Sequence, residues 1–214
     1  MSVRTSLVSR PARRESAAER SRVQTRARLL AAGRELLAER GLHGVTSHEV
    51  AARASVAAGT FYLHFRDKRE LLRVIAAETI ALLRERLDRA TRSARGTREG
   101  VPAFCEALVA FAEEHRERVR ILFSRDGDAT AVEADVLSEL AASLAEARRQ
   151  RIATGEMPAE LDPDVLSQAL VGMLARVVAW WVEDPSRASR ETVARTLARI
   201  QLSGTHPRPG TTLG

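Results

Sequence analysis

Apolar residues recur every three or four positions along most of the chain, which is the spacing of one face of an α-helix. Few stretches alternate with period two, and the helix formers Ala, Leu, Arg and Glu dominate. The first clear stripe predicts a helix from about Val23 to Arg40, with Gly41 as its stop. Its apolar face consists of Leu29, Leu30, Gly33, Leu36 and Leu37. We therefore expect an all-α fold.

Two short helices are predicted after this stripe. Thr46 followed by Glu49 is the pattern of a capping box, so a helix begins just after Thr46 and ends near Ala54. Its inward face is expected to carry Val50, Ala51 and Ala54. A turn, SVAAG, then leads to the second short helix.

The second short helix has a buried and an exposed side. Phe61 and Phe65 are four residues apart and share a face that packs inward. Thr60, Leu63 and His64 then point away from the core, with Tyr62 at the edge.

The pattern of apolar residues predicts further helices in the rest of the chain. Asp67 is expected to cap the next one, and Asp162 with Pro163 marks the start of another. Phe104, Leu108 and Phe111 share one face after the break at 96–100. The helix that Asp67 caps is predicted to run over 67–94, and another helix follows residue 100. A short helix at 121–123 and a loop at 124–129 come next. The last three predicted helices are 130–153, 163–183 and 189–202.

Charge is distributed unevenly. Residues 1–95 carry 20 Lys or Arg against 10 Asp or Glu, whereas residues 96–214 carry 14 against 18. The basic half suits a polyanion, foremost nucleic acid and secondarily a membrane surface. Two short helices joined by a turn within this half indicate a DNA-binding helix-turn-helix, although an ordinary helical hairpin gives the same pattern.

Compartment and membrane signals are few. Cys105 is the only cysteine, which fits a reducing cytoplasm, and we expect it to be a small buried residue. No apolar N-terminal segment suggests a signal peptide. The most apolar run, Ala169–Val182, contains Arg176 and is too short to span a bilayer, so we expect no membrane partner.

The run from Thr25 to Ile75 resembles the N-terminal domain of the TetR family of regulators. The strongest match is G-T-F-Y-x-H-F-x-x-K-x-x-L-L, from Gly59 to Leu72, and the A-E-R-G, T-S and V-A-A-R-A elements precede it in the family's order. The resemblance implies an N-terminal three-helix helix-turn-helix domain. A fourth helix joins it to a helical ligand-binding and dimerisation domain, for about nine helices in all.

The resemblance also implies domain limits. We expect a disordered basic arm at 1–22, a DNA-binding domain at 23–70, an effector-binding and dimerisation domain at 71–203 and a disordered tail at 204–214. Arginines 10, 13 and 14 of the arm either lie in the minor groove or belong to a solvated tail.

DNA contacts are carried over by position. Thr46 and Ser47 match phosphate contacts, and His48 matches a position that reaches a base edge in some members. The remaining positions face the major groove or the DNA backbone. The positions that match groove-facing residues are Ala58, Gly59, Thr60 and Leu63. Those that match contacts to the DNA backbone are Tyr62, His64 and Lys68.

Three positions depart from the family pattern. Ser55 stands where glycine is usual, Ala57 where a capping serine or threonine is common, and Ala58 where a polar residue is common. The recognition helix therefore offers few hydrogen-bonding groups to bases. We expect DNA shape and contacts with thymine methyl groups to contribute more to sequence specificity.

The resemblance places an effector pocket and a dimer interface in the second domain. Each pocket candidate is also compatible with plain core, and the alternative to a dimer is a monomer that buries its eighth helix centrally. The pocket candidates are Phe104, Leu108, Phe111, Phe123, Met173 and Trp180. The interface candidates are Val165, Leu166, Leu170, Leu174, Val177, Val178, Trp181 and Leu197.

The function implied is a ligand-responsive transcription regulator in the cytoplasm. It is expected to be a repressor that binds an inverted-repeat operator as a homodimer and is released by an apolar or aromatic effector. The alternative is an architectural DNA-binding protein without an effector. No catalytic motif, cofactor or metal is indicated, and His115 beside Glu113 and Glu114 is interpreted as a solvated histidine.

Overall fold

The computed structural model describes residues 17–123, 127–155 and 160–203, and within these ranges the chain is helical with no strand. The all-α prediction is confirmed. The helices are α1 Ala17–Arg40, α2 Ser47–Arg53, α3 Ala58–Tyr62, α4 Lys68–Thr91, α5 Thr97–Glu114, α6 Arg116–Leu122, α7 Gly127–Ala153, α8 Pro163–Glu183 and α9 Arg190–Ser203, with a short 3-10 turn, η1 Pro185–Arg187.

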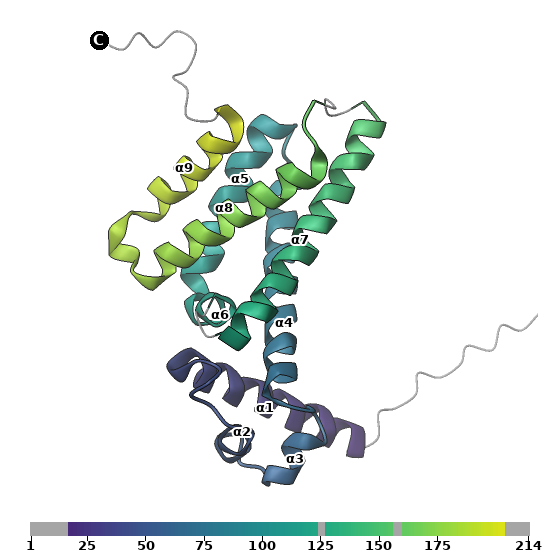
Figure 1. Ribbon diagram of the computed structural model, residues 1–214, viewed down its shortest axis with the longest axis vertical. Coiled ribbons are helices and arrows are strands. Elements are labelled where there is room, and N and C mark those ends of the chain that lie inside the picture. Colours follow the sequence, from purple (N-terminus) through teal and green to yellow (C-terminus); the bar gives the residue numbers. More distant parts are fainter. Residues whose placement is uncertain (1–16, 124–126, 156–159, 204–214) are drawn as a thin grey trace, which may run out of the picture.

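The helices form two units joined by one long helix. Figure 1 shows α1, α2 and α3 at one end, α5 to α9 as a bundle at the other, and α4 running from the first unit into the second. In the bundle α5 packs against α9 and α4, and α7 packs against α8 and α4. The short helix α6 contacts both α1 and α8, so it bridges the units.

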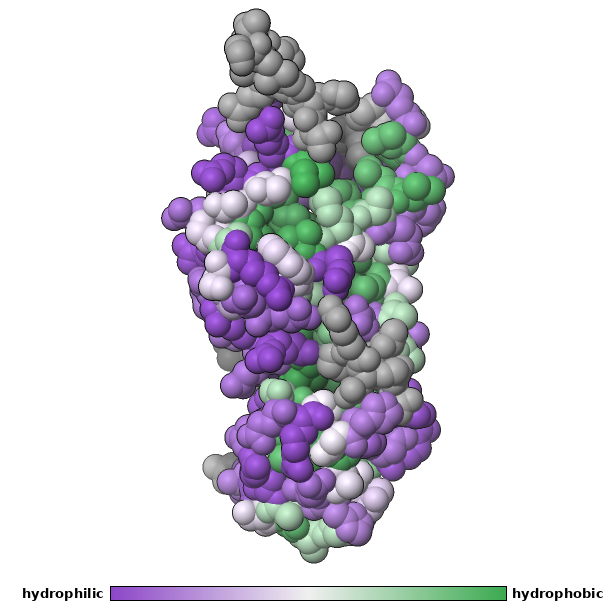
Figure 2. All heavy atoms as spheres, turned by 60° about the vertical axis from the view of Figure 1, so that its left-hand side comes forward, coloured by the Kyte–Doolittle hydropathy of each residue, from purple (hydrophilic) through white to green (hydrophobic). Residues whose placement is uncertain are grey.

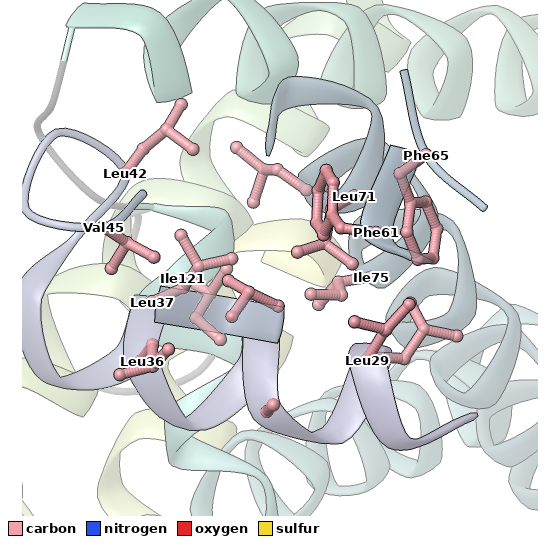
Figure 3. Close-up of a cluster of buried hydrophobic side chains, with 14 of the residues drawn as sticks. Leu29, Leu36, Leu37, Leu42, Val45, Phe61, Phe65, Leu71, Ile75 and Ile121 are labelled. Atoms are coloured by element: carbon pink, nitrogen blue, oxygen red, sulfur yellow. The ribbon is translucent and has the colours of Figure 1, made fainter. Parts of the chain in front are cut away.

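The first core lies where α1 meets α3 and α4 (Figure 3). Phe61 and Phe65 are buried there, as their spacing predicted. A Cβ atom at Gly33 would stand 2.7 Å from Cδ2 of Leu71, so this glycine lets α1 and α4 approach closely. Ile121 of α6 also belongs to this core, so the bundle is anchored on the first unit.

The second core lies among α5, α8 and α9. Cys105, Phe111, Trp181 and Leu197 are all buried in it. The indole nitrogen of Trp181 donates a hydrogen bond of 2.8 Å to the carbonyl oxygen of Ala188, so its polar atom is satisfied despite burial. Burial raises the pKa of the Cys105 thiol to about 11, in keeping with a structural side chain.

Several predicted boundaries were wrong. Helix α1 begins at Ala17, not Val23, because the segment AAERSR consists mostly of good helix formers although it lacks an apolar stripe. Helix α7 begins at Gly127 rather than Thr130, and α6 begins at Arg116 rather than Ile121. Helix α4 ends at Thr91, three residues early. The arginines at 10, 13 and 14 and the tail 204–214 lie outside the described residues.

Helix α8 is long and apolar enough to cross a membrane by length and composition, and it is the one such helix in the described part of the chain. It packs against α5, α6 and α7, and Val178, Trp181 and Val182 are buried in the second core. These contacts are typical of the central helix of a helical bundle.

Candidate functional site

The N-terminus of α2 is built as the sequence predicted. The Thr46 hydroxyl accepts a hydrogen bond of 3.2 Å from the Glu49 backbone nitrogen, and the Glu49 carboxylate accepts one of 2.8 Å from the Thr46 nitrogen. The hydrogen bond from the Thr46 hydroxyl contributes most to lowering the pKa of Glu49 to about 2, and the Thr46 amide and Arg40 add to it. This capping box leaves Thr46 and His48 exposed and Ser47 partly exposed at the outer end of the unit.

The turn between α2 and α3 has an unusual backbone. Ser55 has a φ of 54°, the left-handed conformation that glycine adopts more easily. Arg28 of α1 donates hydrogen bonds to the carbonyl oxygens of Ala54 and, over 2.8 Å, of Ser55. Ala57 provides no side-chain cap for α3, as predicted. The turn is therefore held from α1 and not by a cap of its own.

One side of α3 faces solvent. Leu63 is 72% exposed and Tyr62 is 53% exposed, while Phe61 of the same turn is buried. Ala58 and Gly59 are exposed, and Thr60 and His64 are partly buried. Figure 2 shows apolar surface at this end of the molecule, at the height of α3 in Figure 1. A largely apolar, small-residue face whose hydroxyl groups are those of Thr60 and Tyr62 fits methyl and shape contacts better than a dense hydrogen-bond readout.

His64 stands beside basic residues of α1. Burial lowers the pKa of His64, and the charges of Arg22 and Arg26 lower it further. Arg26 also lies over the Phe65 ring, 5.2 Å from its centroid. The N-terminal part of α1 thus brings positive charge next to α3.

Lys68 has an internal role that the sequence did not reveal. Its ammonium nitrogen donates hydrogen bonds of 2.7 Å to the carbonyl oxygen of Leu42 and 3.1 Å to that of Val45. Both carbonyls belong to the link between α1 and α2, so Lys68 ties this link to the start of α4. An ammonium has three N–H groups, so these two bonds leave one for another acceptor.

A cavity of about 410 Å³ lies inside the bundle. Leucine, valine and phenylalanine side chains of α4, α5, α6, α7 and α8 form most of its wall, which is the character of a small-molecule site. Of the predicted pocket residues it contains Phe104, Leu108, Phe111 and Phe123.

Two predicted pocket residues lie elsewhere. Met173 packs against the second core, and Trp180 is 40% exposed, with the Arg187 guanidinium 5.3 Å from its ring centroid. Neither residue lines this cavity, and the sequence of a nearly all-apolar helix does not reveal which of its sides meets a cavity. Sequence reasoning also missed the contributions of α4 and α7, among them Leu83, Leu87, Val136, Leu137 and Leu140.

A few titratable side chains are part of the cavity wall. Glu133 lines it, and burial raises the pKa of its carboxyl. Arg84 and Asp88, one turn apart on α4, line the same wall and a second hollow between α4 and α7. Among the described residues no three His, Cys, Asp or Glu side chains are grouped to hold a metal ion.

Helix α6 connects the cavity to the first unit. Leu122 and Phe123 both line the cavity, and both pack in the first core together with residues of α1 and α4. A ligand that moves either side chain therefore disturbs the packing of the helix-turn-helix unit directly.

The predicted dimer residues divide into two groups. Leu174, Val178, Trp181 and Leu197 are buried within the protomer, and the first two line the cavity, so that part of the prediction was wrong. Leu166, Leu170 and Val177 are partly buried. Val165 is 68% exposed and is the one member that offers a large open surface.

The open side of α8 is a different stripe. Val165, Ala169, Gly172, Arg176 and Trp180 are exposed at helical spacing along one face. Ile200 of α9 is exposed as well, and Figure 2 shows apolar surface on the side of α8 and α9. Small residues at the middle of the stripe permit close approach of another helix.

Residues 29–75 match the family model described as bacterial regulatory proteins, tetR family. The HTH-type transcriptional activator FasR of Mycolicibacterium smegmatis is 30% identical over 105 residues, which is 49% of this chain and 48% of FasR. The match thus spans about half the length of that relative.

Solved structures share the fold over most of the chain. The fatty acid degradation regulator FadR of Bacillus halodurans has a TM-score of 0.73 at 20% identity, covering 86% of this chain and 97% of that one. FadR of Bacillus subtilis, solved in complex with stearoyl-CoA, has a TM-score of 0.68 at 19% identity, covering 84% and 99%. A TetR-family regulator of Pectobacterium atrosepticum has a TM-score of 0.63 at 28% identity, covering 91% and 100%. Residues 29–75, which include the helix-turn-helix described above, thus match the N-terminal domain of the TetR family of bacterial regulatory proteins, and the chain as a whole is similar in fold to solved TetR-family regulators.

Proposed function

We propose that this protein is a homodimeric repressor in the cytoplasm that binds an inverted-repeat operator and is released when an apolar effector fills the bundle cavity. The observation that carries the proposal is the double role of Leu122 and Phe123, which belong to both the cavity wall and the first core. A ligand that fills the cavity must displace the side chains of Leu122 and Phe123, and the present packing of the DNA-binding unit requires these side chains where they are.

DNA binding is supported by the outer end of the first unit. The hydroxyl groups of Thr46 and Ser47 stand at the N-terminus of α2, where they suit phosphate oxygens. His48 and the open side of α3, with Thr60 and Leu63, are assigned to base edges in the major groove.

Dimerisation is supported by the exposed stripe of α8 with Ile200 of α9. A two-fold dimer through these helices presents two copies of α3 to successive turns of the major groove, about 34 Å apart. The FadR of Bacillus subtilis was solved with stearoyl-CoA, which favours a fatty acyl compound as the effector class here.

The architectural alternative predicts a bundle without an enclosed cavity. A cavity of about 410 Å³ with a mainly apolar wall favours the regulator. An enzyme needs a constellation of reacting groups, and the regulators to which this chain is similar supply no precedent for one.

The test begins with selection of bound duplexes from a random-sequence pool by the purified full-length protein. An enriched inverted repeat is expected, and a pool bound without enrichment would favour the architectural alternative. Stearoyl-CoA is then titrated into the complex with the selected operator, with fluorescence anisotropy of labelled DNA as the readout. Release is expected, and it should weaken in Leu122→Ala, which removes contacts between cavity and first core. Tighter DNA binding on addition of the acyl compound would contradict the repressor mechanism.

A further inference from the structure

A buried guanidinium group without a partner lies where the two units of the molecule meet. Nη1 of Arg118, on α6, is buried and has no hydrogen-bond partner among the described residues. Figure 1 shows α6 at the junction between the bundle and α1, and α6 packs against both α1 and α4. A buried donor that is left unpaired destabilises the conformation that contains it. A conformation that gives Arg118 an acceptor would therefore be more favourable in this respect.

Arg118 lies on the packed side of α6. Ile121 follows it by three residues and Leu122 by four, so the three side chains share one side of the helix. Ile121 and Leu122 are both buried in the first core with residues of α1 and α4, and Figure 3 shows Ile121 there. The side chain of Arg118 thus enters the same junction one turn nearer the start of α6.

Two charged side chains at this junction act on Arg118. Arg34 of α1 donates a hydrogen bond of 3.3 Å to Oε2 of Glu78 on α4, which forms an ion pair between the two helices. Burial lowers the pKa of Arg118, the positive charge of Arg34 lowers it further, and the negative charge of Glu78 opposes both. One carboxylate thus stands near two guanidinium groups and, within the described part of the chain, forms an ion pair with Arg34 alone.

The three charged residues differ in their relation to the bundle cavity. Val119, directly after Arg118, lines the cavity, and so does Thr79, directly after Glu78. Arg34 belongs to α1, and no described residue of α1 lines the cavity. A ligand in the cavity therefore touches the immediate neighbours of Arg118 and Glu78, whereas it reaches Arg34 only through them.

We propose that Glu78 is exchanged between two arginines, pairing with Arg34 in the operator-binding form and with Arg118 in the released form. The proposal rests on the proposed function and describes how a ligand in the bundle cavity regulates the DNA-binding unit. A ligand that displaces Val119 moves α6 and brings Arg118 toward Glu78, and the like charge of Arg118 then weakens the ion pair of Arg34. Without that ion pair α1 loses a polar contact with the middle of α4, so the helix-turn-helix unit can change its orientation to the bundle.

Solvent exposure makes the exchange energetically feasible. The side chains of Arg34 and Glu78 are 25% and 39% exposed, so water replaces part of their ion pair when it breaks. Pairing of Arg118 satisfies a donor that water does not reach in the present packing. Each arrangement thus has one paired guanidinium group, and an effector that favours the second arrangement can change their populations.

Thermal unfolding of the DNA-free full-length protein tests the exchange itself. Arg118→Met removes the unpaired donor and should raise the unfolding temperature by about 2 to 4 °C. In the Arg34→Met background Arg118 pairs with Glu78, so the same substitution should lower the unfolding temperature by about 2 to 4 °C. The sign of the effect therefore reverses between the two backgrounds. Arg116→Met, on an exposed position of α6, is the control and should have the same small effect in both.

Operator binding tests the regulatory consequence, with fluorescence anisotropy of the selected operator measured first without effector. Arg34→Met should weaken operator binding about three- to tenfold, because Glu78 is then free to pair with Arg118. The double variant Arg34→Met/Arg118→Met should recover most of this affinity, whereas a purely structural pair of Arg34 and Glu78 predicts no recovery. Arg118→Met alone should require about three- to tenfold more stearoyl-CoA for half release of the operator.

The exchange is overturned by an effect of Arg118→Met on the unfolding temperature that has the same sign in both backgrounds. A double variant that binds the operator no better than Arg34→Met overturns the role of the exchange in regulation. Selection of no operator, or failure of stearoyl-CoA to release the unmodified protein, would instead contradict the proposed function. The unfolding temperatures still decide in that case whether Glu78 is exchanged, because neither DNA nor effector is present in that measurement.

Discussion

Lys68 donates a hydrogen bond of 2.7 Å from its ammonium group to the carbonyl oxygen of Leu42. With the 3.1 Å bond to Val45, this contact fixes the link between α1 and α2 on the first turn of α4. The lysine assigned to phosphate by resemblance is therefore also a structural element of the DNA-binding unit.

Lys68→Ala should destabilise the protein by about 2 kcal/mol, since hydrogen bonds from a charged donor contribute about 1.5 to 3 kcal/mol each and water replaces part of this. Urea unfolding measures the loss. Arg73→Ala, five residues further along α4 and exposed, removes a positive charge without these hydrogen bonds and should unfold like the unmodified protein. In DNA binding, Lys68→Ala should reduce the slope of affinity against salt by about 1. An unchanged slope would restrict Lys68 to the structural role.

His48→Ala tests direct base readout. His48 is exposed at the start of α2, beside the groups assigned to phosphate. We expect a loss of about 1 to 3 kcal/mol confined to one base pair in each half-site. Affinities for a set of operators substituted at single positions give the answer. An equal loss for every sequence would reassign His48 to the DNA backbone.

Ser55→Gly should stabilise the protein by about 0.5 to 1 kcal/mol. A left-handed backbone costs an ordinary residue about 1 to 2 kcal/mol, and the greater freedom of glycine in the unfolded chain offsets part of the gain. The reverse change, Gly41→Ser, places a side chain at a φ of 66° and should lower stability by about 1 kcal/mol. Destabilisation by Ser55→Gly would mean that the serine side chain stabilises the turn more than its conformation strains it.

The capping box makes part of the stability of the folded protein dependent on pH. Because the pKa of Glu49 is lowered from 4.5 to about 2 in the folded protein, its stabilising effect is complete above pH 4.5 and declines as the pH falls toward 2. The difference in stability between the unmodified protein and Glu49→Gln should therefore be constant from pH 7 to 5 and shrink below pH 4.5. Urea unfolding across pH 7 to 3 measures it. Glu85→Gln, on the exposed side of α4, is the control, and an identical pH profile for both variants would contradict the role of the cap.

Gly172→Glu tests the dimer interface. No atom lies within 4 Å of a Cβ built at Gly172, so the protomer accepts the side chain, whereas two charges at the centre of the exposed stripe would repel across a two-fold axis. We expect folded monomers in sedimentation velocity. Ala142→Glu, on an exposed position of α7, should leave the dimer intact. A dimer that persists in Gly172→Glu would move the interface to another face.

Local signals in the sequence predicted the first unit well. The capping pair Thr46 and Glu49, the spacing of Phe61 and Phe65, and the uncapped Ala57 all have local causes, and the structure confirms each. The placement of Asp162 as a cap before Pro163 is confirmed for the same reason.

Predictions that depended on which helix sides meet were less successful. Helix α8 is apolar around most of its circumference, so its sequence does not distinguish the side toward the cavity, with Leu174 and Val178, from the exposed side with Trp180. The bonds of Lys68 to carbonyl oxygens more than 20 residues away leave no trace in the local pattern either.

The continuity of α4 has a geometric consequence. Its first turn carries Lys68 beside the α1–α2 link of the first unit, and its last turn carries Thr91 in the wall of the bundle cavity, with no break among its 24 residues. Such a helix is about 36 Å long, so tilting it by about 5° about one end displaces the other by about 3 Å. That displacement is close to the rise of one base pair, about 3.4 Å. Two protomers moving in opposite senses would place their recognition helices out of phase with the operator by about two base pairs. A small rotation of α4 in each protomer is thus sufficient to move the two recognition helices out of register with two successive major grooves.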